Sequence, residues 1–312
     1  MFDLGFGDSY LLRELLFTYL NPSGYVQAFL KKENLGYGFD DSKIRNYVRS
    51  LLKDFTDTDY SSIILTHGGT GGVLASVRGL GHKVGVYDET HYIFYPDIFK
   101  NAGVFHSKTD AKFLLTSSPN NPTGIISSGN VFKGDVIWDA VYHTPAYMSR
   151  RKLKQKPDHA VLVGSFSKLL GLNGVRVGFV ATNNYILANN IIKAAEIETL
   201  NLSNPSLSLL NNIVDRVDVN LFSDDAGRLM DDNREEMAKI EYLFSSPVPE
   251  TGMFYFPKID KDSIKILNKA GIKYIEGSLC GDPQRIRLSI GQTRDITKKA
   301  VSAILKADKV KG

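Results

Sequence analysis

The chain has 312 residues, of which 43% are hydrophobic and 23% charged, and its formal net charge is +4. This length is enough for one large domain and a smaller one, and the charge is too small and too evenly spread to indicate binding to nucleic acid. No apolar run approaches the roughly 20 residues that span a bilayer, so we expect no membrane-spanning segment. The single cysteine, Cys280, excludes an intrachain disulfide and predicts a reducing, cytoplasmic location.

Short apolar runs alternate with stretches of helical length from about residue 40 to residue 215. The runs are 62–66, 83–88, 103–107, 112–117, 135–139, 160–166 and 175–182. They are apolar on both faces and separated by helices, which is typical of a mostly parallel sheet covered by helices. The sequence therefore predicts an α/β fold with a large domain over 40–215.

The pattern changes after residue 216. A long charged helical stretch is followed by apolar runs at 252–259, 271–277 and 284–291, and further helices are expected around 264–270 and 293–307. This order predicts a small α+β domain over 216–312. The N-terminal segment, 1–39, is too short to fold alone, and we expect it to pack on the small domain or on a partner subunit.

Polar and reactive side chains follow the ends of several predicted strands. Gly68–Gly72 follow the first strand, Tyr92 the second and Asn121 the fourth, while Asp139 ends the fifth and Lys168 follows the sixth. In open α/β sheets, ligands bind beyond the carboxyl ends of the strands. These residues are therefore expected to share one site.

The residue types at these strand ends suit a particular cofactor. The glycine-rich turn offers backbone N–H groups to a phosphate from Thr70 onward, and Ser165, Ser167 and Arg176 add hydroxyls and a guanidinium. Asp139 closes an apolar strand, so its carboxylate is expected to need a cationic partner. A phosphate, an aromatic nitrogen that needs a carboxylate and a lysine able to form an imine together describe pyridoxal phosphate.

Four segments resemble motifs of the fold-type I pyridoxal-phosphate enzymes, the aspartate-aminotransferase-like family. They are "SSPNNPTG" (117–124), "DAVY" (139–142), "SFSKLLGLNGVRVG" (165–178) and "RLSIG" (287–291), and they occur in the family's order and spacing. The resemblance covers nearly the whole chain and implies the fold-type I architecture. The ending "RLSIGQTRD" is most similar to the histidinol-phosphate branch, but "GIKYIEG" lacks that branch's second arginine and offers only Lys273 nearby.

The resemblance also implies roles for the residues around the cofactor ring. Lys168 would form the Schiff base with the cofactor and move the substrate Cα proton as general base. Asp139 would keep the pyridine nitrogen protonated, and Tyr142 and Asn121 would hydrogen-bond the ring oxygen. Tyr92 would stack on the ring, although many relatives have tryptophan or phenylalanine there.

The same resemblance assigns the phosphate and the substrate. Arg287 would bind the substrate α-carboxylate with help from Gly7 and Asn121, although the neighbouring Arg285 is a competing candidate. Tyr37, in "LGYGFD", matches a tyrosine that reaches the phosphate of the other subunit, which implies a homodimer. The phosphate itself would be held by Gly69, Thr70, Ser165, Ser167 and Arg176.

These assignments predict an aminotransferase that moves an amino group between an amino acid and a 2-oxo acid in two half-reactions. A decarboxylase of the threonine-phosphate kind, a β-eliminating lyase and a histidinol-phosphate aminotransferase remain alternatives, because they share the fold. No second arginine for an acidic substrate side chain is identifiable. No metal site is expected, because the histidines have no partners at ligand spacing.

A dinucleotide-binding unit is the main rival interpretation of the first βαβ segment. Gly69 and Gly71 fit the first two glycine positions of that motif, and Asp88 stands at a suitable distance for a ribose, but Leu74 occupies the third glycine position. A nicotinamide enzyme would have no use for Lys168 as it is placed, so we favour pyridoxal phosphate.

Overall fold

The computed structural model describes residues 1–5, 7–20, 40–127, 132–244 and 246–309. The strands are β1 (Phe2–Asp3), β2 (Ser62–Thr66), β3 (Val84–Tyr87), β4 (Phe105–His106), β5 (Phe113–Ser117), β6 (Asp135–Asp139), β7 (Val161–Ser165), β8 (Gly178–Thr182), β9 (Phe254–Tyr255), β10 (Ile272–Lys273), β11 (Ile275–Glu276) and β12 (Ile286–Ser289). The helices are α1 (Tyr10–Tyr19), α2 (Ser42–Thr56), α3 (Gly68–Leu80), α4 (Tyr95–Ala102), α5 (Phe166–Leu169), α6 (Tyr185–Thr199), α7 (Asn204–Val214), α8 (Val219–Ala238), α9 (Lys261–Lys269) and α10 (Arg294–Lys309). Within these ranges, no helix is both long enough and apolar enough to cross a membrane.

The seven apolar runs between residues 62 and 182 form one sheet. Its strand order is β2-β8-β7-β6-β5-β3-β4. Every neighbouring pair is parallel except the two pairs made by β8, which runs antiparallel to both β2 and β7. The predicted mostly parallel sheet is thus confirmed, and its parallel strands direct their carboxyl ends to one edge.

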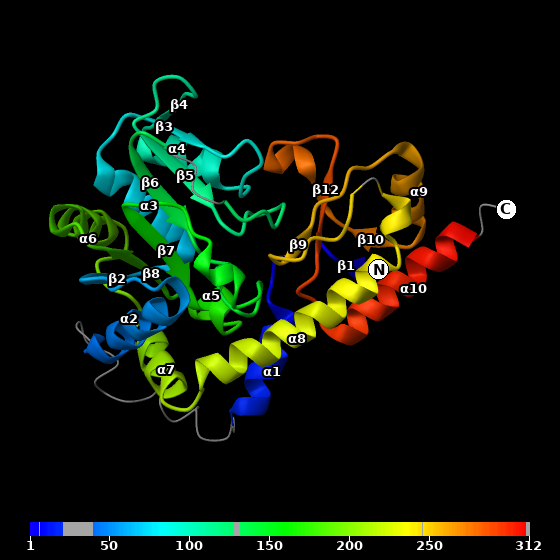
Figure 1. Cartoon of the computed structure of the whole chain (residues 1–312), viewed down its shortest axis with the longest axis horizontal. Coiled ribbons are helices and arrows are strands. Elements are labelled where there is room, and N and C mark those ends of the chain that lie inside the picture. Colours follow the sequence, from blue (N-terminus) through cyan, green and yellow to red (C-terminus); the bar gives the residue numbers. More distant parts are fainter. Residues whose placement is uncertain (6, 21–39, 128–131, 245, 310–312) are drawn as a thin grey trace.

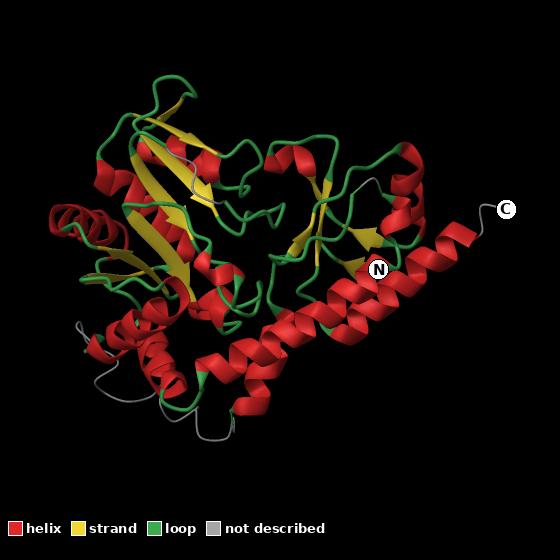
Figure 2. Cartoon of the chain, viewed as in Figure 1, coloured by secondary structure: helices red, strands yellow, loops and turns green. Residues whose placement is uncertain are grey.

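Both faces of this sheet are buried, which explains the apolar runs. In β2, Ile63 and Leu65 belong to one core and Ile64 to the other; in β7, Leu162 belongs to the first core and Val163 to the second. This alternation follows from the two-residue period of a strand. Helices α2, α5 and α7 supply the first core, and α3, α4 and α6 supply the second, so that helices cover the sheet on both sides (Figure 2).

The C-terminal part of the chain combines helices with two small sheets. The long helices α8 and α10 lie side by side (Figure 1), and α1 packs against α8. Strands β11, β12 and β9 form an antiparallel sheet, and β1 pairs in parallel with β10. The N-terminal segment therefore contacts this part through β1 and α1. The domain boundaries at residues 40 and 216 stay predictions.

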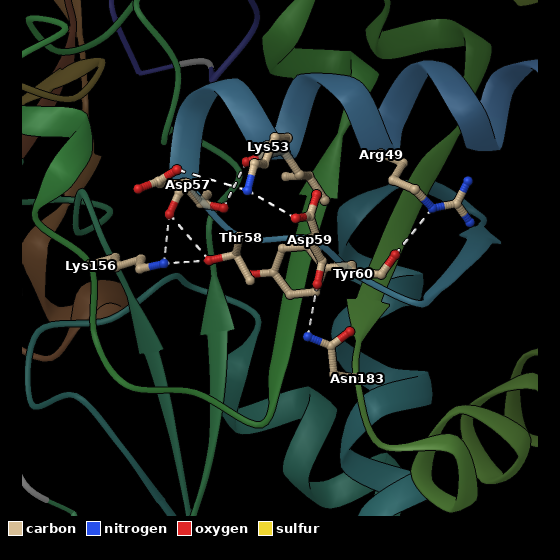
Figure 3. Close-up of polar contacts among 10 residues, drawn as sticks. Arg49, Lys53, Asp57, Thr58, Asp59, Tyr60, Lys156 and Asn183 are labelled. Atoms are coloured by element: carbon tan, nitrogen blue, oxygen red, sulfur yellow. Dashed lines mark hydrogen bonds and ion pairs between the residues drawn. The ribbon is translucent and has the colours of Figure 1, made fainter.

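A cluster of polar contacts fixes the end of α2 and the turn that leads into β2 (Figure 3). Asp57 ends the helix in the left-handed conformation, at φ 55°, and its N–H donates to the carbonyl of Lys53. The Lys53 Nζ lies 2.9 Å from Asp59 Oδ2, and Asn183 Nδ2 donates to the Asp59 carbonyl at 2.9 Å. Lys156 Nζ donates to the last carbonyl of α2 at 2.6 Å. These contacts set where β2 starts, and β2 leads directly into the glycine turn of the site.

Candidate active site

A cavity of about 440 Å³ lies beyond the carboxyl ends of the parallel strands, where the large sheet faces the C-terminal part. This volume is within the range of roughly 300–1,000 Å³ that small-ligand sites occupy. Tyr37 lies outside the described residues. The other residues that the resemblance assigns to the cofactor and the substrate line this cavity: Gly7, Gly69, Thr70, Tyr92, Asn121, Asp139, Tyr142, Ser165, Ser167, Lys168, Arg176 and Arg287. Of the glycine-rich turn 68–72, only Gly69 and Thr70 belong to the lining.

Lys168 reaches the cavity from the short helix α5, which begins where β7 ends. The Ser165 side chain caps this helix by accepting a hydrogen bond from the backbone at position 167, 3.2 Å away. The Lys168 ammonium donates to the carbonyl of Gly7. Burial lowers the pKa of Lys168 to about 7; the carboxylate of Asp8 opposes this shift, and Arg287 adds to it. A lysine of this kind loses its proton near neutral pH, as imine formation requires.

Asp139 ends β6 with a buried carboxylate that has hydrogen bonds but, among the described residues, no counter-ion. Its Oδ2 accepts from the Tyr95 hydroxyl at 2.8 Å, and its Oδ1 accepts from the Val141 N–H at 3.2 Å. No protein side chain within the described ranges forms an ion pair with Asp139, so the cationic partner that the sequence predicts for it is left to a ligand. Burial raises the Asp139 pKa to about 6. The carboxylate is thus poised to receive a cation from a ligand.

Tyr95 is a site residue that the sequence analysis missed. Its ring is fully buried at the first position of α4, three residues after Tyr92. A buried carboxylate at a strand end needs hydrogen-bond donors. The sequence could therefore have predicted that some donor contacts Asp139, but not that the donor is Tyr95. The two rings meet edge to face with centroids 5.8 Å apart.

Two tyrosines and an asparagine border the middle of the cavity. The Tyr92 hydroxyl lies 3.4 Å from the Thr70 Oγ1, and its ring packs edge to face on Phe94 at 5.4 Å. Tyr142 is 7% exposed and packs edge to face on Phe254 at 5.8 Å. Burial raises the Tyr142 pKa well above its usual value, so the phenol stays protonated and can donate a hydrogen bond.

The glycine turn and Arg176 form the anion-binding end of the cavity. Helix α3 is assigned from Gly68, and Gly68 itself adopts φ +71°, a left-handed conformation that glycine tolerates and that turns the chain from β2 into the helix. A Cβ at Gly68 would collide with the Arg176 guanidinium, and one at Gly178 would collide with the Gly68 backbone. Ser167 Oγ is buried without a hydrogen-bond partner in the described structure. A helix N-terminus, a guanidinium and a free hydroxyl therefore converge where an anion would bind.

Arg287, on β12, is a buried arginine that has no acidic partner among the residues that the structure describes. Its side chain lies over the Phe254 ring at 4.2 Å, and its Nη1 donates to Asn121 Oδ1 at 3.1 Å. The residue is 4% exposed, its Nε has no partner, and no carboxylate pairs with it in the portion of the chain that the structure describes. Arg285, the competing candidate, is held in an ion pair and does not line the cavity. The geometry therefore favours Arg287 as the carboxylate ligand.

A second missed group lies beside Lys168. Asp8 lines the cavity, and its Oδ1 accepts from Asn173 Nδ2 at 2.6 Å and forms an ion pair with Arg13. Asn173 also lines the cavity. Because Asp8 directly follows Gly7, its place near the cavity could have been predicted from the sequence. Its contact with Asn173 could not, because the two residues are far apart in the chain.

Asp88, which the dinucleotide interpretation assigned to a ribose, does not face the cavity. Its Oδ2 accepts from Thr116 Oγ1 at 3.0 Å, from the Ser117 N–H at 3.1 Å and from Asn120 Nδ2 at 3.4 Å. The carboxylate is thus committed to the end of β5 and to the loop that follows it. Its geometry does not support the dinucleotide interpretation.

Comparison with known proteins agrees with this geometry. A family model described as aminotransferase class I and II matches residues 97–304. The chain belongs to this family. The family match and the sheet confirm the fold-type I class, while the resemblance to the histidinol-phosphate branch stays a prediction.

Curated members of the family resemble only part of this chain. The aspartate aminotransferase of Thermotoga maritima is 22% identical over 234 residues, which are 68% of this chain and 59% of that protein. Tryptophan aminotransferase-related protein 1 of Oryza sativa is 26% identical over 186 residues, 54% of this chain and 42% of that protein. The chain thus spans about three fifths or less of the length of these two relatives.

A solved family structure matches almost the entire chain in fold. The crystal structure of the aromatic aminotransferase from Pyrococcus horikoshii superposes with a TM-score of 0.80 at 16% identity, covering 99% of this chain and 96% of that one. At this identity the match supports the shared fold alone.

Proposed function

We propose that this member of the family is a pyridoxal-phosphate-dependent aminotransferase that moves an amino group between an amino acid and a 2-oxo acid. One observation carries the proposal. A single cavity brings the Lys168 amine together with Asp139 and Arg287, two buried charged groups that lack oppositely charged partners among the residues described. A cationic ring nitrogen would compensate the first, and a substrate carboxylate would compensate the second.

The residues of the cavity fit pyridoxal phosphate. Asp139 would hold the ring nitrogen, Tyr142 and Asn121 would donate hydrogen bonds to the ring oxygen, and Tyr92 would cover the ring. When bound, the cofactor supplies the electron sink that lets a bond at the substrate Cα break. The free hydroxyl of Ser167 supports the phosphate assignment. The phosphate would be held by Gly69, Thr70, Ser165, Ser167 and Arg176.

Lys168 and Arg287 would have different roles toward the substrate: Lys168 would transfer a proton, and Arg287 would bind the carboxylate. A group with a pKa of about 7 takes up and returns a proton readily at neutral pH, so Lys168 Nζ would move the Cα proton. Arg287, fixed by Asn121 and Phe254, would bind the carboxylate and set the orientation of the Cα bonds. The Gly7 carbonyl, which accepts from Lys168, would keep the amine at the substrate end of the cavity.

The alternatives receive less support. A decarboxylase or β-eliminating lyase of the same fold would use the same residues, and we place transamination first because the family that matches is an aminotransferase family. A histidinol-phosphate or threonine-phosphate substrate would need a further cation in the cavity. Lys273, the candidate for that role, lies 3.9 Å from Asp3 in an ion pair and does not line the cavity.

We further propose that the chain forms a homodimer in the cytoplasm. Phe94 lines the cavity yet keeps 45% of its surface exposed, and Arg176 is also exposed at the phosphate end. A partner subunit would cover both and would bring its Tyr37 to the phosphate. The buried free thiol of Cys280 supports a reducing compartment. Light scattering of the purified protein tests the dimer.

The visible spectrum of the protein with pyridoxal phosphate tests the activity. We expect a bound-cofactor band that borohydride makes permanent on Lys168 and that Lys168→Ala abolishes, while the control Lys154→Ala, at an exposed lysine, keeps it. One or more of a panel of amino acids should convert the cofactor to its amino form, and a 2-oxo acid should restore the band. Bound cofactor without conversion by any amino acid would overturn transamination, and absence of the band would overturn the cofactor assignment.

A further inference from the structure

The substrate-binding arginine is supported by a carboxylate outside the cavity. We propose that Asp88 is a positioning residue that fixes the loop after β5 and, through Asn121, the Arg287 guanidinium that binds the substrate carboxylate. This inference rests on the proposed function, because it assigns Arg287 to the substrate. It concerns a residue that lies outside the four motifs of the aminotransferase-like family.

Asp88 anchors the loop at its start. Three donors converge on the single oxygen Oδ2: the Thr116 hydroxyl and Ser117 N–H at the end of β5, at 3.0 and 3.1 Å, and the Asn120 amide at 3.4 Å. The first two come from the strand and the third from the loop. The carboxylate therefore ties the loop to the end of the strand that precedes it.

Hydrogen bonds extend from this anchor to the arginine. Asn120 Nδ2 also donates to Ser117 Oγ at 3.3 Å, and the same Oγ accepts from the Asn121 N–H at 3.1 Å. Asn121 Oδ1 in turn accepts from Arg287 Nη1 at 3.1 Å. Ser117, Asn120 and Asn121 are all buried, so each of these bonds is shielded from water. A shift of the loop would move the only side-chain oxygen among the described residues that accepts from the Arg287 guanidinium.

The chemistry of Asp88 suits this task better than a neutral residue would. An anionic oxygen makes hydrogen bonds roughly twice as strong as a neutral one. An asparagine would keep one acceptor oxygen but would place an N–H₂ group among donors. Burial raises the pKa of Asp88 to about 6, and the bonds from Ser117, Thr116 and Asn120 oppose this shift, so the group is anionic at physiological pH.

The test compares Asp88→Asn with Glu89→Gln in the holoenzyme. Glu89 is the adjacent carboxylate, is exposed and pairs with Lys108 on the surface, so its replacement is the matched control. For Asp88→Asn we expect KM for the amino donor to rise about fivefold or more. We expect kcat to change less than KM and the cofactor to stay bound on Lys168, because neither Lys168 nor Asp139 belongs to the chain of contacts. The cofactor band should shift only slightly, through the bond that Asn121 would donate to the ring oxygen. Glu89→Gln should leave both constants unchanged.

A second variant and a binding measurement keep the inference testable if Asp88→Asn folds poorly. Thr116→Val removes one donor while it preserves the shape of the strand residue, and it should raise KM in the same direction by a smaller factor. Calorimetric binding of 3-phenylpropionate, a carboxylate with no amino group to transfer, should weaken in parallel with KM. This measurement needs no turnover, so it separates a failure of the inference from a failure of the proposed activity. Unchanged KM and unchanged 3-phenylpropionate affinity in both variants, or an equal loss of kcat and cofactor absorbance, would overturn the inference.

Discussion

Replacing Asp139 by asparagine tests whether the Asp139 carboxylate is a buried charge without a counter-ion in the cofactor-free protein. The folded protein raises the pKa of this carboxyl from 3.8 to about 6, chiefly through burial. Because the folded state then binds the proton more tightly than the unfolded state does, the wild-type protein loses stability as pH rises from about 4 through about 6. The amide introduced by Asp139→Asn does not ionise, so ionisation at this position does not lower the stability of the cofactor-free variant as pH rises.

The structure sets the size of the effect. The interval between 3.8 and about 6 corresponds to about 3 kcal/mol of unfolding free energy, at about 1.4 kcal/mol for each pH unit. An amide offers one acceptor oxygen, so the variant loses one of the bonds from Tyr95 and Val141, which costs about 1 kcal/mol. We therefore expect Asp139→Asn to be about 2 kcal/mol more stable than wild type at about pH 8 and about 1 kcal/mol less stable at about pH 4.

Urea unfolding of the cofactor-free proteins across this pH range measures the difference. The exposed carboxylate Asp54 on α2 provides the control Asp54→Asn, which should show no crossover. Added pyridoxal phosphate should stabilise wild type by about 2.7 kcal/mol at a hundredfold excess over its dissociation constant, and the Asp139 variant by much less. A stability difference that does not vary with pH would refute the assignment of a buried, unpaired charge to Asp139.

Three further substitutions test the support around the cavity and α2. Tyr95→Phe removes a donor to Asp139, so the Asp139 pKa should rise further above about 6 in a carboxyl NMR titration of the cofactor-free protein; an unchanged titration would contradict the contact. Gly68→Ala places a Cβ against Arg176 at a positive φ, and we expect equilibrium dialysis to show pyridoxal-phosphate affinity at least about tenfold weaker, whereas unaltered affinity would count against the anion site. Asp57→Gly relieves a left-handed backbone at φ 55° and should stabilise the protein by about 1 kcal/mol in urea unfolding; a loss of stability would show that the Asp57 side chain contributes more than its backbone conformation costs.

The strands of the large sheet were predictable because each carries its own signal. A strand buried on both faces must be apolar along its whole length, and the helices between such strands leave a clear spacing. The small strands carry no such signal. The run 271–277 suggests one strand, yet the structure divides it into β10, which pairs with β1, and β11, which pairs with β12. The backbone at Gly5 crosses it so closely that a Cβ there would lie 3.0 Å from the Tyr274 carbonyl carbon, a contact between distant segments that local sequence does not reveal.

The same distinction separates the predicted site residues from the missed ones. Residues such as Lys168 and Asp139 sit at strand ends, and a parallel sheet brings strand ends together regardless of loop details. Tyr95 and Asn173 matter only because of which atom they meet, at 2.8 Å from Asp139 and 2.6 Å from Asp8. Such contacts depend on loop and helix orientation, which the apolar pattern does not specify.

The pairing of charges distinguishes Arg287 from Arg285 as the carboxylate ligand, a choice that the strand pattern does not decide. Arg285 and Arg287 are two residues apart, so a regular strand over 285–287 would place both side chains on the same face, and alternation cannot separate them. Arg285 has an acid three residues earlier, Asp282, and the structure pairs the two at 3.0 Å. Arg287 has no such neighbour and remains buried without a carboxylate in the described part of the chain. Because an unpaired buried charge costs several kcal/mol, the arginine whose partner is missing is the one whose partner is expected to be the substrate.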